Sequence, residues 1–334
     1  MAEAELHIWM QEHVAGFQGP MQLHRLAGGQ SNPTWRVDTP NQSYVLRQKP
    51  LGPVLPSAHA VDREFRVMQA LAGTDVPVPK VWALCEDPSV MGSMFFVMEF
   101  IEGRVFYDPR LPDQTPDARA AIFDSMNQAF SAISTVDPMA VGLGDYGRHG
   151  GYVARTVNRW AKQYRASETR SIPAMDALID WLPQNLPQRE EEVRVVHGDF
   201  RMDNLLIHPT EPKVLAVIDW ELGTLGCPLS DFAYHMMTWR VSPDLFRGLA
   251  GAVIPGSGIP TEEAYIADWC RRTGRDKPAD FDLYLIVNLF RMAAILQGIA
   301  KRAEEGTASD PDAHEVGARA VPMAQIAWDM ARRL

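Results

Sequence analysis

The hydrophobic pattern of the chain changes near Gly103, and this change constrains the fold more than any other feature of the sequence. Before it, short apolar runs bounded by turn residues are typical of strands: three within residues 21–50, then one each at 78–84 and 93–101. A short helix at about 2–14 precedes them, and a second helix separates the third strand from the fourth. This part of the sequence therefore predicts five antiparallel strands with one helix packed against them.

After Gly103, apolar residues recur at the spacings of three and four that indicate helices. One small strand region, at about 193–218, interrupts them. We therefore expect an α+β fold of two lobes, strand-rich over residues 1–102 and helix-rich over residues 103–334, with a ligand site favoured in the cleft between them. The predicted helices of the second lobe cover about 116–136, 150–167, 173–185, 228–241, 261–273, 279–304 and 311–333.

The composition argues against several classes of protein. With 42 acidic against 32 basic residues the net charge is -10, which disfavours a nucleic-acid binder that works by neutralising phosphates. Cys85, Cys227 and Cys270 lack C-x-x-C spacing, so neither a disulfide framework nor a thiolate metal site is expected. The N-terminus has no signal-peptide pattern, and the apolar run 288–300 is interrupted by Arg291 and too short to span a bilayer. We expect a cytoplasmic monomer or homodimer without membrane contact.

Polar residues gather on short loops within the strand region. The segment V-V-H-G-D-F-R-M-D-N places His197, Asp199 and Asn204 between apolar runs, and Asp219 ends the next apolar run. Phosphoryl transfer needs a carboxylate that orients and deprotonates an acceptor hydroxyl, and oxygen ligands that hold Mg²⁺ against the phosphates of ATP. The H-x-D-x-x-x-x-N spacing, followed by a strand-terminal aspartate, supplies these parts in the kinase order.

Two other interpretations of these residues stay open at this point. Asp, Asn and Gly are common in turns, so His197, Asp199 and Asn204 could simply stabilise turns. An H-x-D metallohydrolase site would need further His and Asp motifs, which the sequence lacks. The agreement of four residue types in order and context favours phosphoryl transfer.

With these residues the chain resembles the aminoglycoside phosphotransferase/choline kinase branch of the protein-kinase-like fold. The resemblance implies a bilobal fold, ATP, Mg²⁺ and a small acceptor with a hydroxyl group. Asp199 would be the catalytic base, Asn204 and Asp219 the Mg²⁺ ligands, and His197 a support of the catalytic loop. Asp231 would brace the same loop through backbone hydrogen bonds, although it also fits an ordinary acid facing a helix dipole.

The resemblance assigns nucleotide-binding roles in the first lobe as well. Arg47 would grip the phosphates with Glu64 orienting it, but Lys49 lies on the same strand face, and Arg47 and Glu64 could instead form an exposed pair of little worth. A glycine-containing segment lies where the kinase phosphate loop would be, since glycine permits tight turns with exposed N–H groups; a plain hairpin turn is the alternative. Its residues are Gly28, Gly29, Gln30, Ser31 and Asn32.

The run F-F-V-M-E-F-I-E-G resembles the hinge segment that binds adenine. Backbone groups of Glu99 to Ile101 would pair with the adenine edge, and Met98 would line the pocket. Met98 can equally be read as a core methionine that fills a gap.

Within this branch the chain resembles in particular the phosphotransferase domain that some eukaryotes fuse to an acyl-CoA dehydrogenase. The shared segments are G-G-Q-S-N-P-T at 28–34, V-L-R at 45–47, R-W-x-x-Q-Y at 159–164 and H-G-D-F-R-x-D-N at 197–204. The implied activity is phosphorylation of a hydroxyl group on an acyl-CoA.

One segment reverses the overall charge of the chain. Residues 148–170 contain six basic residues and one acid, in a chain of net charge -10. On a helix, several of these bases share a face beside an aromatic pair. Guanidinium groups suit phosphate oxygens and flat rings stack on bases, so the segment is predicted to hold coenzyme A. The predicted contacts are Arg155, Arg159, Trp160 and Tyr164.

Alternatives for the acceptor and the activity stay open. The basic helix could be amphipathic, with Trp160 in the core and its arginines paired with acids of neighbouring helices. An antibiotic kinase would need acids that hold a polycation, and Glu262, Glu263 and Asp268 are candidates. A pseudokinase or binding protein would keep the fold without the chemistry, although the base and both metal ligands are present.

Overall fold

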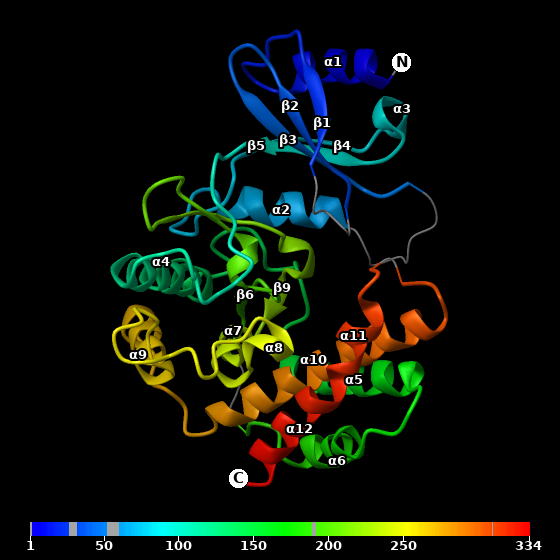
Figure 1. Ribbon diagram of the computed structural model, residues 1–334. Helices are drawn as coiled ribbons and strands as arrows, with labels where there is room; N and C mark the ends of the chain where they lie inside the picture. The colour runs from blue at the N-terminus through cyan, green and yellow to red at the C-terminus, as the bar shows by residue number, and fades with distance from the viewer. Residues whose placement is uncertain (1, 27–31, 52–59, 189–191, 309) are drawn as a thin grey trace.

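Five antiparallel strands form the sheet of the first lobe, in the order β1-β2-β3-β5-β4 (Figure 1). The computed structural model describes residues 2–26, 32–51, 60–188, 192–308 and 310–334. Strands β3 and β5 lie at the centre of the sheet and pair in a register that sets Arg47 opposite Phe96. The strands are β1 Gln22–Arg25, β2 Thr34–Asp38, β3 Ser43–Gln48, β4 Val81–Cys85 and β5 Phe95–Glu99.

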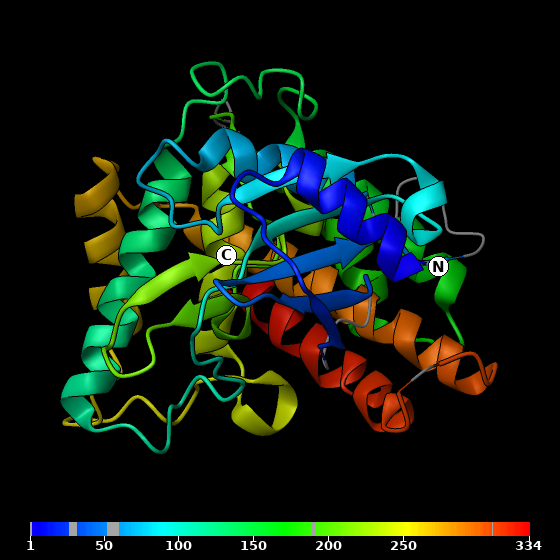
Figure 2. The ribbon, with the colours of Figure 1, turned by 90° about the horizontal axis from the view of Figure 1, so that it is seen from above.

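Helices cover both faces of this sheet because its side chains alternate (Figure 2). Phe95 and Val97 on β5 pack in one apolar cluster with residues of α1 (Ala2–His13), while Phe96 between them packs against α2 (Val61–Leu71). Helix α2 buries Glu64 together with its apolar face. A buried acid on this helix needs a cation, and the sheet provides one.

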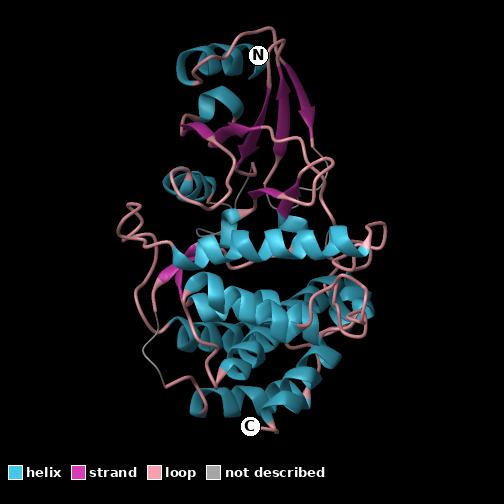
Figure 3. Cartoon of the chain, turned by 90° about the vertical axis from the view of Figure 1, so that its left-hand side faces the viewer, coloured by secondary structure: helices cyan, strands magenta, loops and turns pink. Residues whose placement is uncertain are grey.

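Nine helices follow in the described part of the second lobe (Figure 3), and two of the predictions need correction. The helix predicted over 311–333 is broken at Arg319, because Pro322 lacks the N–H that would continue it. The one-turn helix α8 was not predicted. The helices are α4 Pro116–Thr135, α5 Tyr152–Ser167, α6 Pro173–Trp181, α7 Pro228–Arg240, α8 Pro243–Phe246, α9 Glu262–Thr273, α10 Phe281–Glu304, α11 Ala313–Ala318 and α12 Ala320–Ala331. Another one-turn helix, α3 Pro88–Met91, lies in the first lobe.

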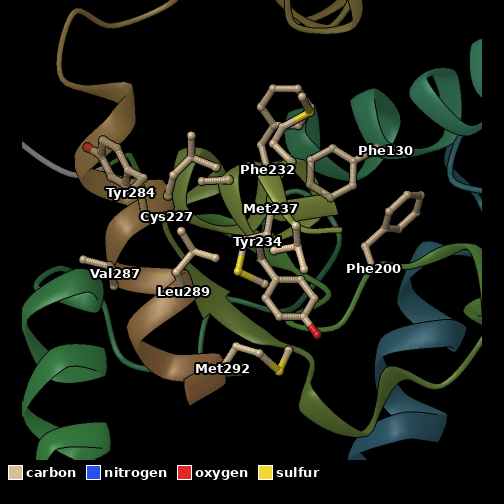
Figure 4. Close-up of a cluster of buried hydrophobic side chains, with 14 of the residues drawn as sticks. Phe130, Phe200, Cys227, Phe232, Tyr234, Met237, Tyr284, Val287, Leu289 and Met292 are labelled. Carbon is tan, nitrogen blue, oxygen red and sulfur yellow. The ribbon is translucent and has the colours of Figure 1, made fainter. Parts of the chain in front are cut away.

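Helix α10 is the long core helix of the second lobe. It has 24 residues, so the prediction that its apolar run is too short to span a bilayer is wrong on length. In the structure, 72% of its apolar window is buried inside the molecule, as in the core helix of a folded domain. Figure 4 shows side chains of α7 and α10 together in this core.

The second lobe contains two small antiparallel ladders. Strand β6 (Arg194–Val196) pairs with β9 (Thr224–Gly226), and β7 (Leu205–Ile207) pairs with β8 (Val214–Val217). The loops that join these strands carry the predicted catalytic residues. The predicted α+β fold, with a five-stranded antiparallel sheet followed by helices, is confirmed.

Candidate active site

Two buried side chains fix the loop that follows β6, here called the catalytic loop (residues 197–204). At the first turn of α7, Asp231 accepts hydrogen bonds from the N–H groups of His197 (2.8 Å) and Gly198 (2.9 Å). Burial raises the pKa of the Asp231 carboxyl, while these donors favour its ionised form. His197 donates through Nε2 to the carbonyl of Ile218 (3.0 Å), since its Nδ1 accepts from the N–H of Asp199 (3.2 Å). Asp231 and His197 thus contact the loop in the way predicted for its supports.

Glycine is required at the turn of this loop. Gly198 has φ +80°, and a Cβ atom there would lie 2.9 Å from the carbonyl oxygen of Leu222. The close approach brings the catalytic loop against the segment that follows β8. Asp199 and the residues after Asp219 therefore belong to one site.

Three side chains orient the carboxylate of Asp199. Tyr234 of α7 donates its hydroxyl to Oδ1, and the guanidinium of Arg201 contacts Oδ1 (3.1 Å) and Oδ2 (3.2 Å). Asn204 donates from Nδ2 to Oδ2 (3.1 Å) and to the backbone carbonyl of Asp199 (2.8 Å). An acid that is held on both oxygens and still 19% exposed can accept a proton from a group at the cleft surface.

The two predicted metal ligands present oxygen atoms to the same site. Because the amide nitrogen of Asn204 is committed to Asp199, its Oδ1 remains for a cation. Asp219 follows β8 by two residues and adopts the left-handed region, with φ 66°. A non-glycine residue in this conformation costs about 1–3 kcal/mol and is found where function requires it.

Arg47 connects the sheet to the metal-ligand segment. Its Nε donates to Oε2 of Glu64 (2.7 Å) and its Nη2 to Oδ1 of Asp219 (2.6 Å). Burial alone would lower the pKa of Arg47, but the two carboxylates raise it, so the guanidinium stays charged. Burial also raises the pKa of Glu64, and the ion pair with Arg47 opposes that shift. These contacts favour Arg47 over Lys49 as the phosphate-binding cation.

The predicted phosphate loop falls mostly outside the described residues. Gly29, Gln30 and Ser31 are among the residues that are not described. Asn32 is buried, and its carbonyl accepts a hydrogen bond from Oγ1 of Thr34 (3.1 Å). The role of the glycine segment therefore stays a prediction.

The hinge prediction needs one correction. The N–H of Glu99 donates to the carbonyl of Lys80 (2.8 Å), so it is not available to an adenine. The carbonyl of Glu99 and the backbone of Ile101 remain for that role. Met98 is half-buried beside them and packs against the main core, as both interpretations of this residue require.

Comparison with known proteins agrees with this geometry. Residues 22–279 match the model of the phosphotransferase enzyme family. The chain belongs to this family. The predicted family is thereby confirmed, and membership supports small-molecule kinase activity.

Several relatives carry this domain within longer proteins. Acyl-CoA dehydrogenase family member 10 of Mus musculus is 46% identical over 94% of this chain and 30% of its own length. Acyl-CoA dehydrogenase family member 11 of Rattus norvegicus is 39% identical over 98% of this chain and 43% of its own length. The chain spans less than half the length of these relatives.

Solved structures share the fold. A protein of Ralstonia eutropha assigned to the aminoglycoside phosphotransferases is 52% identical, with a TM-score of 0.93 over 99% of this chain and 98% of that one. Choline kinase of Cryptosporidium parvum has a TM-score of 0.66 over 98% of this chain and 96% of its own, at 12% identity. The second likeness shows the fold alone.

A cleft beside the catalytic loop is lined by five arginines, and we call it the arginine cleft. Its walls also include Gly198, Leu222, Trp160 and one acid, Asp145, which pairs with Arg66 outside the cleft. Among the described residues, none of the five forms an ion pair with a carboxylate. Such a concentration of positive charge suits an anionic ligand. The five are Arg63, Arg148, Arg155, Arg159 and Arg291.

The structure separates the predicted coenzyme A contacts of α5. Tyr164 is fully buried, and its hydroxyl accepts a hydrogen bond from the N–H of Ile172 (3.3 Å), so the predicted stacking role is wrong. Trp160 is half-buried on the wall of the cleft, with the guanidinium of Arg291 5.9 Å from its ring centre. Arg159 is exposed at the same cleft.

The arginines of α5 differ in what they contact. Arg165 pairs with Asp176 (2.5 Å) and Glu168 (3.3 Å), as the amphipathic-helix alternative requires. Arg155 instead donates to the backbone carbonyls of Gly150 and Arg148. Carbonyl contacts hold its guanidinium in place without cancelling its charge.

Sequence reasoning missed three side chains of the site. Tyr234 and Arg201 hold Asp199, while Arg291 donates to the carbonyl of Gly198 (2.8 Å) and lies 4.8 Å from the ring centre of Tyr234. Arg201 follows the base by two residues, and Arg291 is a charge in an apolar helix, which needs a partner. Both signals were present in the sequence.

Proposed function

We propose that this chain transfers the γ-phosphoryl group of Mg·ATP to a hydroxyl group of a small acceptor. The observation that carries the proposal is that Asn204 bonds both Asp199 and the backbone beside Asp219, while Arg47 bonds Asp219 itself. Arg47 reaches Asp219 at 2.6 Å while Glu64 holds its other edge at 2.7 Å. A base, oxygen ligands and a phosphate-binding cation are the parts that phosphoryl transfer requires.

The donor set fits magnesium. Asn204 and Asp219 offer hard oxygen ligands, and Mg²⁺ is usually held by one or two carboxylates together with water and substrate phosphates. The described residues contain no cluster of three or more His, Cys, Asp or Glu side chains that could hold a metal alone. Mg²⁺ bound there would neutralise charge on the phosphates.

The protein side chains divide the remaining work. Asp199 accepts the proton of the acceptor hydroxyl while the oxygen of that hydroxyl bonds to the γ-phosphorus. The bond between the γ-phosphorus and ADP breaks in the same step. Tyr234 and Arg201 keep the carboxylate of Asp199 aimed at that hydroxyl. Arg47 binds phosphate oxygens with the Nη2 group that contacts Asp219 in the structure. The products are ADP and a phosphate monoester.

For the acceptor we propose a hydroxyl group on a coenzyme A thioester. The arginine cleft supports this assignment, since it places Arg155, Arg159 and Trp160 beside Gly198 and the catalytic base. The relatives that carry this domain within acyl-CoA dehydrogenase family members support it as well. Tyr164 is no longer part of the proposed contact set.

The acids considered for an antibiotic kinase do not favour a polycation. Glu262 pairs with Arg240 (2.8 Å), and Asp268 pairs with Arg271 (2.8 Å) on its own helix. The charge of Glu262 and Asp268 is therefore partly cancelled by protein cations. No specific observation therefore favours an aminoglycoside over an anionic acceptor.

The test is a measurement of ADP release, with and without Mg²⁺, against hydroxyacyl-CoAs, aminoglycosides, choline and sugars. We expect Mg²⁺-dependent release with a hydroxyacyl-CoA. Release with an aminoglycoside alone would overturn the acceptor and leave the kinase assignment intact. Absence of release with every acceptor would overturn both.

A further inference from the structure

A second pocket opens beside the catalytic loop, between α7, α8 and α12. Its interior volume is about 40 Å³, so it can take only a narrow part of a ligand. Apolar side chains supply most of its wall, and the two methionines Met237 and Met323 are almost completely buried. The apolar wall consists of Tyr107, Met202, Met237, Val241, Phe246 and Met323.

The pocket adjoins the catalytic base. Tyr234 and Arg201 line it, and both contact the carboxylate of Asp199. Figure 4 shows the hydroxyl of Tyr234 pointing away from the buried rings of Phe130 and Phe232. A molecule in this pocket therefore lies beside the groups that orient the base.

The charged groups of the pocket are already paired with one another. Asp203 forms ion pairs with Arg247 and with Arg201 (3.5 Å), and Arg201 also contacts Asp199 (3.1 Å). The carboxylate of Asp203 is therefore not free to bind a polycationic acceptor. The surface left for a ligand is apolar, in contrast to the arginine cleft.

We infer that this pocket binds an apolar chain carried by the acceptor and selects acceptors by the length of that chain. The inference rests on the proposed function, because its occupant is the molecule whose hydroxyl Asp199 deprotonates. Each methylene buried here is expected to raise kcat/KM about threefold to fourfold until the pocket is full. The acceptor would then span the base, with its anionic part in the arginine cleft and its alkyl part in this pocket.

The kinetic test uses a substitution that fills the pocket with a larger side chain, at a partly buried residue of its wall. Thr238 of α7 lines the pocket, and its hydroxyl bonds the carbonyl of His235 (3.0 Å). Thr135 of α4 is a matched control, because its hydroxyl makes the same kind of bond to Ala132 (3.0 Å) on an exposed helix surface. We expect Thr238→Phe to lower kcat/KM for 3-hydroxydecanoyl-CoA at least about tenfold, and to leave 3-hydroxybutyryl-CoA within about twofold. Thr135→Phe should keep the chain-length dependence of the wild-type protein. If Thr238→Phe keeps that dependence too, the inference is wrong.

A binding measurement separates this inference from the proposed function. The probe is 1-octanol, an alcohol with an apolar chain and no coenzyme A, added to protein labelled with carbon-13 at the methionine methyl groups. We expect the NMR signals of Met237 and Met323 to shift in the wild-type protein, and to stay unshifted in Thr238→Phe.

The outcomes divide cleanly. Octanol that shifts both signals, together with coenzyme A thioesters that are not phosphorylated, supports the pocket and overturns the proposed acceptor. Octanol that leaves both signals in place overturns the pocket, whether or not the thioesters are substrates.

Discussion

The catalytic loop and the arginine cleft meet at Gly198, yet they treat charge in opposite ways. At the loop, both acids have protein partners: Tyr234, Arg201 and Asn204 hold Asp199, and two backbone N–H groups of the loop hold Asp231 of α7. In the cleft, five arginines lack an ion pair with any described carboxylate. The loop is complete within the protein, whereas the cleft leaves charge for a ligand to satisfy.

The largest effect is expected in the catalytic loop, at Asp199. Asp199→Asn keeps the size and polarity of the side chain but cannot accept the proton of the acceptor hydroxyl. Turnover should fall by roughly 10² to 10⁴-fold, with the affinity for Mg·ATP little changed. Steady-state kinetics and calorimetry on the same preparation check both parts. Near-normal turnover would mean that another group is the base.

A second variant tests the proposed metal ligand Asp219. Changing a residue that only hydrogen-bonds a metal ligand already costs about 10- to 100-fold in metal affinity. Asp219→Ala removes a ligand itself, so it should cost at least about 100-fold in Mg²⁺-dependent nucleotide binding. Turnover should fall with it. Unchanged Mg·ATP affinity by calorimetry would place the metal elsewhere.

A measurement of stability against pH tests His235, which is buried against Phe200 of the catalytic loop. Burial among Phe200, Phe130 and Tyr265 lowers the pKa of His235 from 6.5 to about 3 in the folded chain. The unfolded chain takes up this proton below pH 6.5 while the folded chain does not, so folding loses about 2 kcal/mol from this group by pH 5. His235→Met should remove that part of the pH dependence. Urea unfolding at pH 7.5 and pH 5 checks this. An equal loss of unfolding free energy between the two pH values in both proteins would contradict it.

The smallest effect is expected in the arginine cleft. Arg159→Ala should raise KM for a hydroxyacyl-CoA by about tenfold or less and leave KM for ATP nearly unchanged, because the side chain is exposed and screened by salt. Arg165→Ala is the control on the same helix, since Arg165 is already paired with Asp176 and Glu168. Equal effects of the two variants would remove the distinction between the cleft and an ordinary helix surface.

The catalytic loop was predictable because its roles depend on short spacings. His197, Asp199 and Asn204 lie in one loop between apolar strands, and the fold fixes their mutual positions locally. The choice between Arg47 and Lys49 needed more than the period of two, which puts both on one face. The contacts of Arg47 with Glu64 and Asp219 supply that information.

The acceptor side was less predictable because it depends on neighbours that are distant in sequence. Helical spacing put Trp160 and Tyr164 on one edge, but the segment at Ile172 covers Tyr164. Arg291 reaches Gly198 from α10, across 93 residues of sequence. A periodic pattern gives the face of a helix, and tertiary packing decides what covers it.

Phosphorus NMR of the purified chain with ATP, Mg²⁺ and a 3-hydroxyacyl-CoA tests phosphoryl transfer at Asp199 most directly. We expect ADP and a new phosphate monoester in the wild-type reaction, and neither at a comparable rate with Asp199→Asn or without Mg²⁺. Formation of the monoester at the wild-type rate by Asp199→Asn, or ATP left intact with every hydroxyl acceptor, would contradict it.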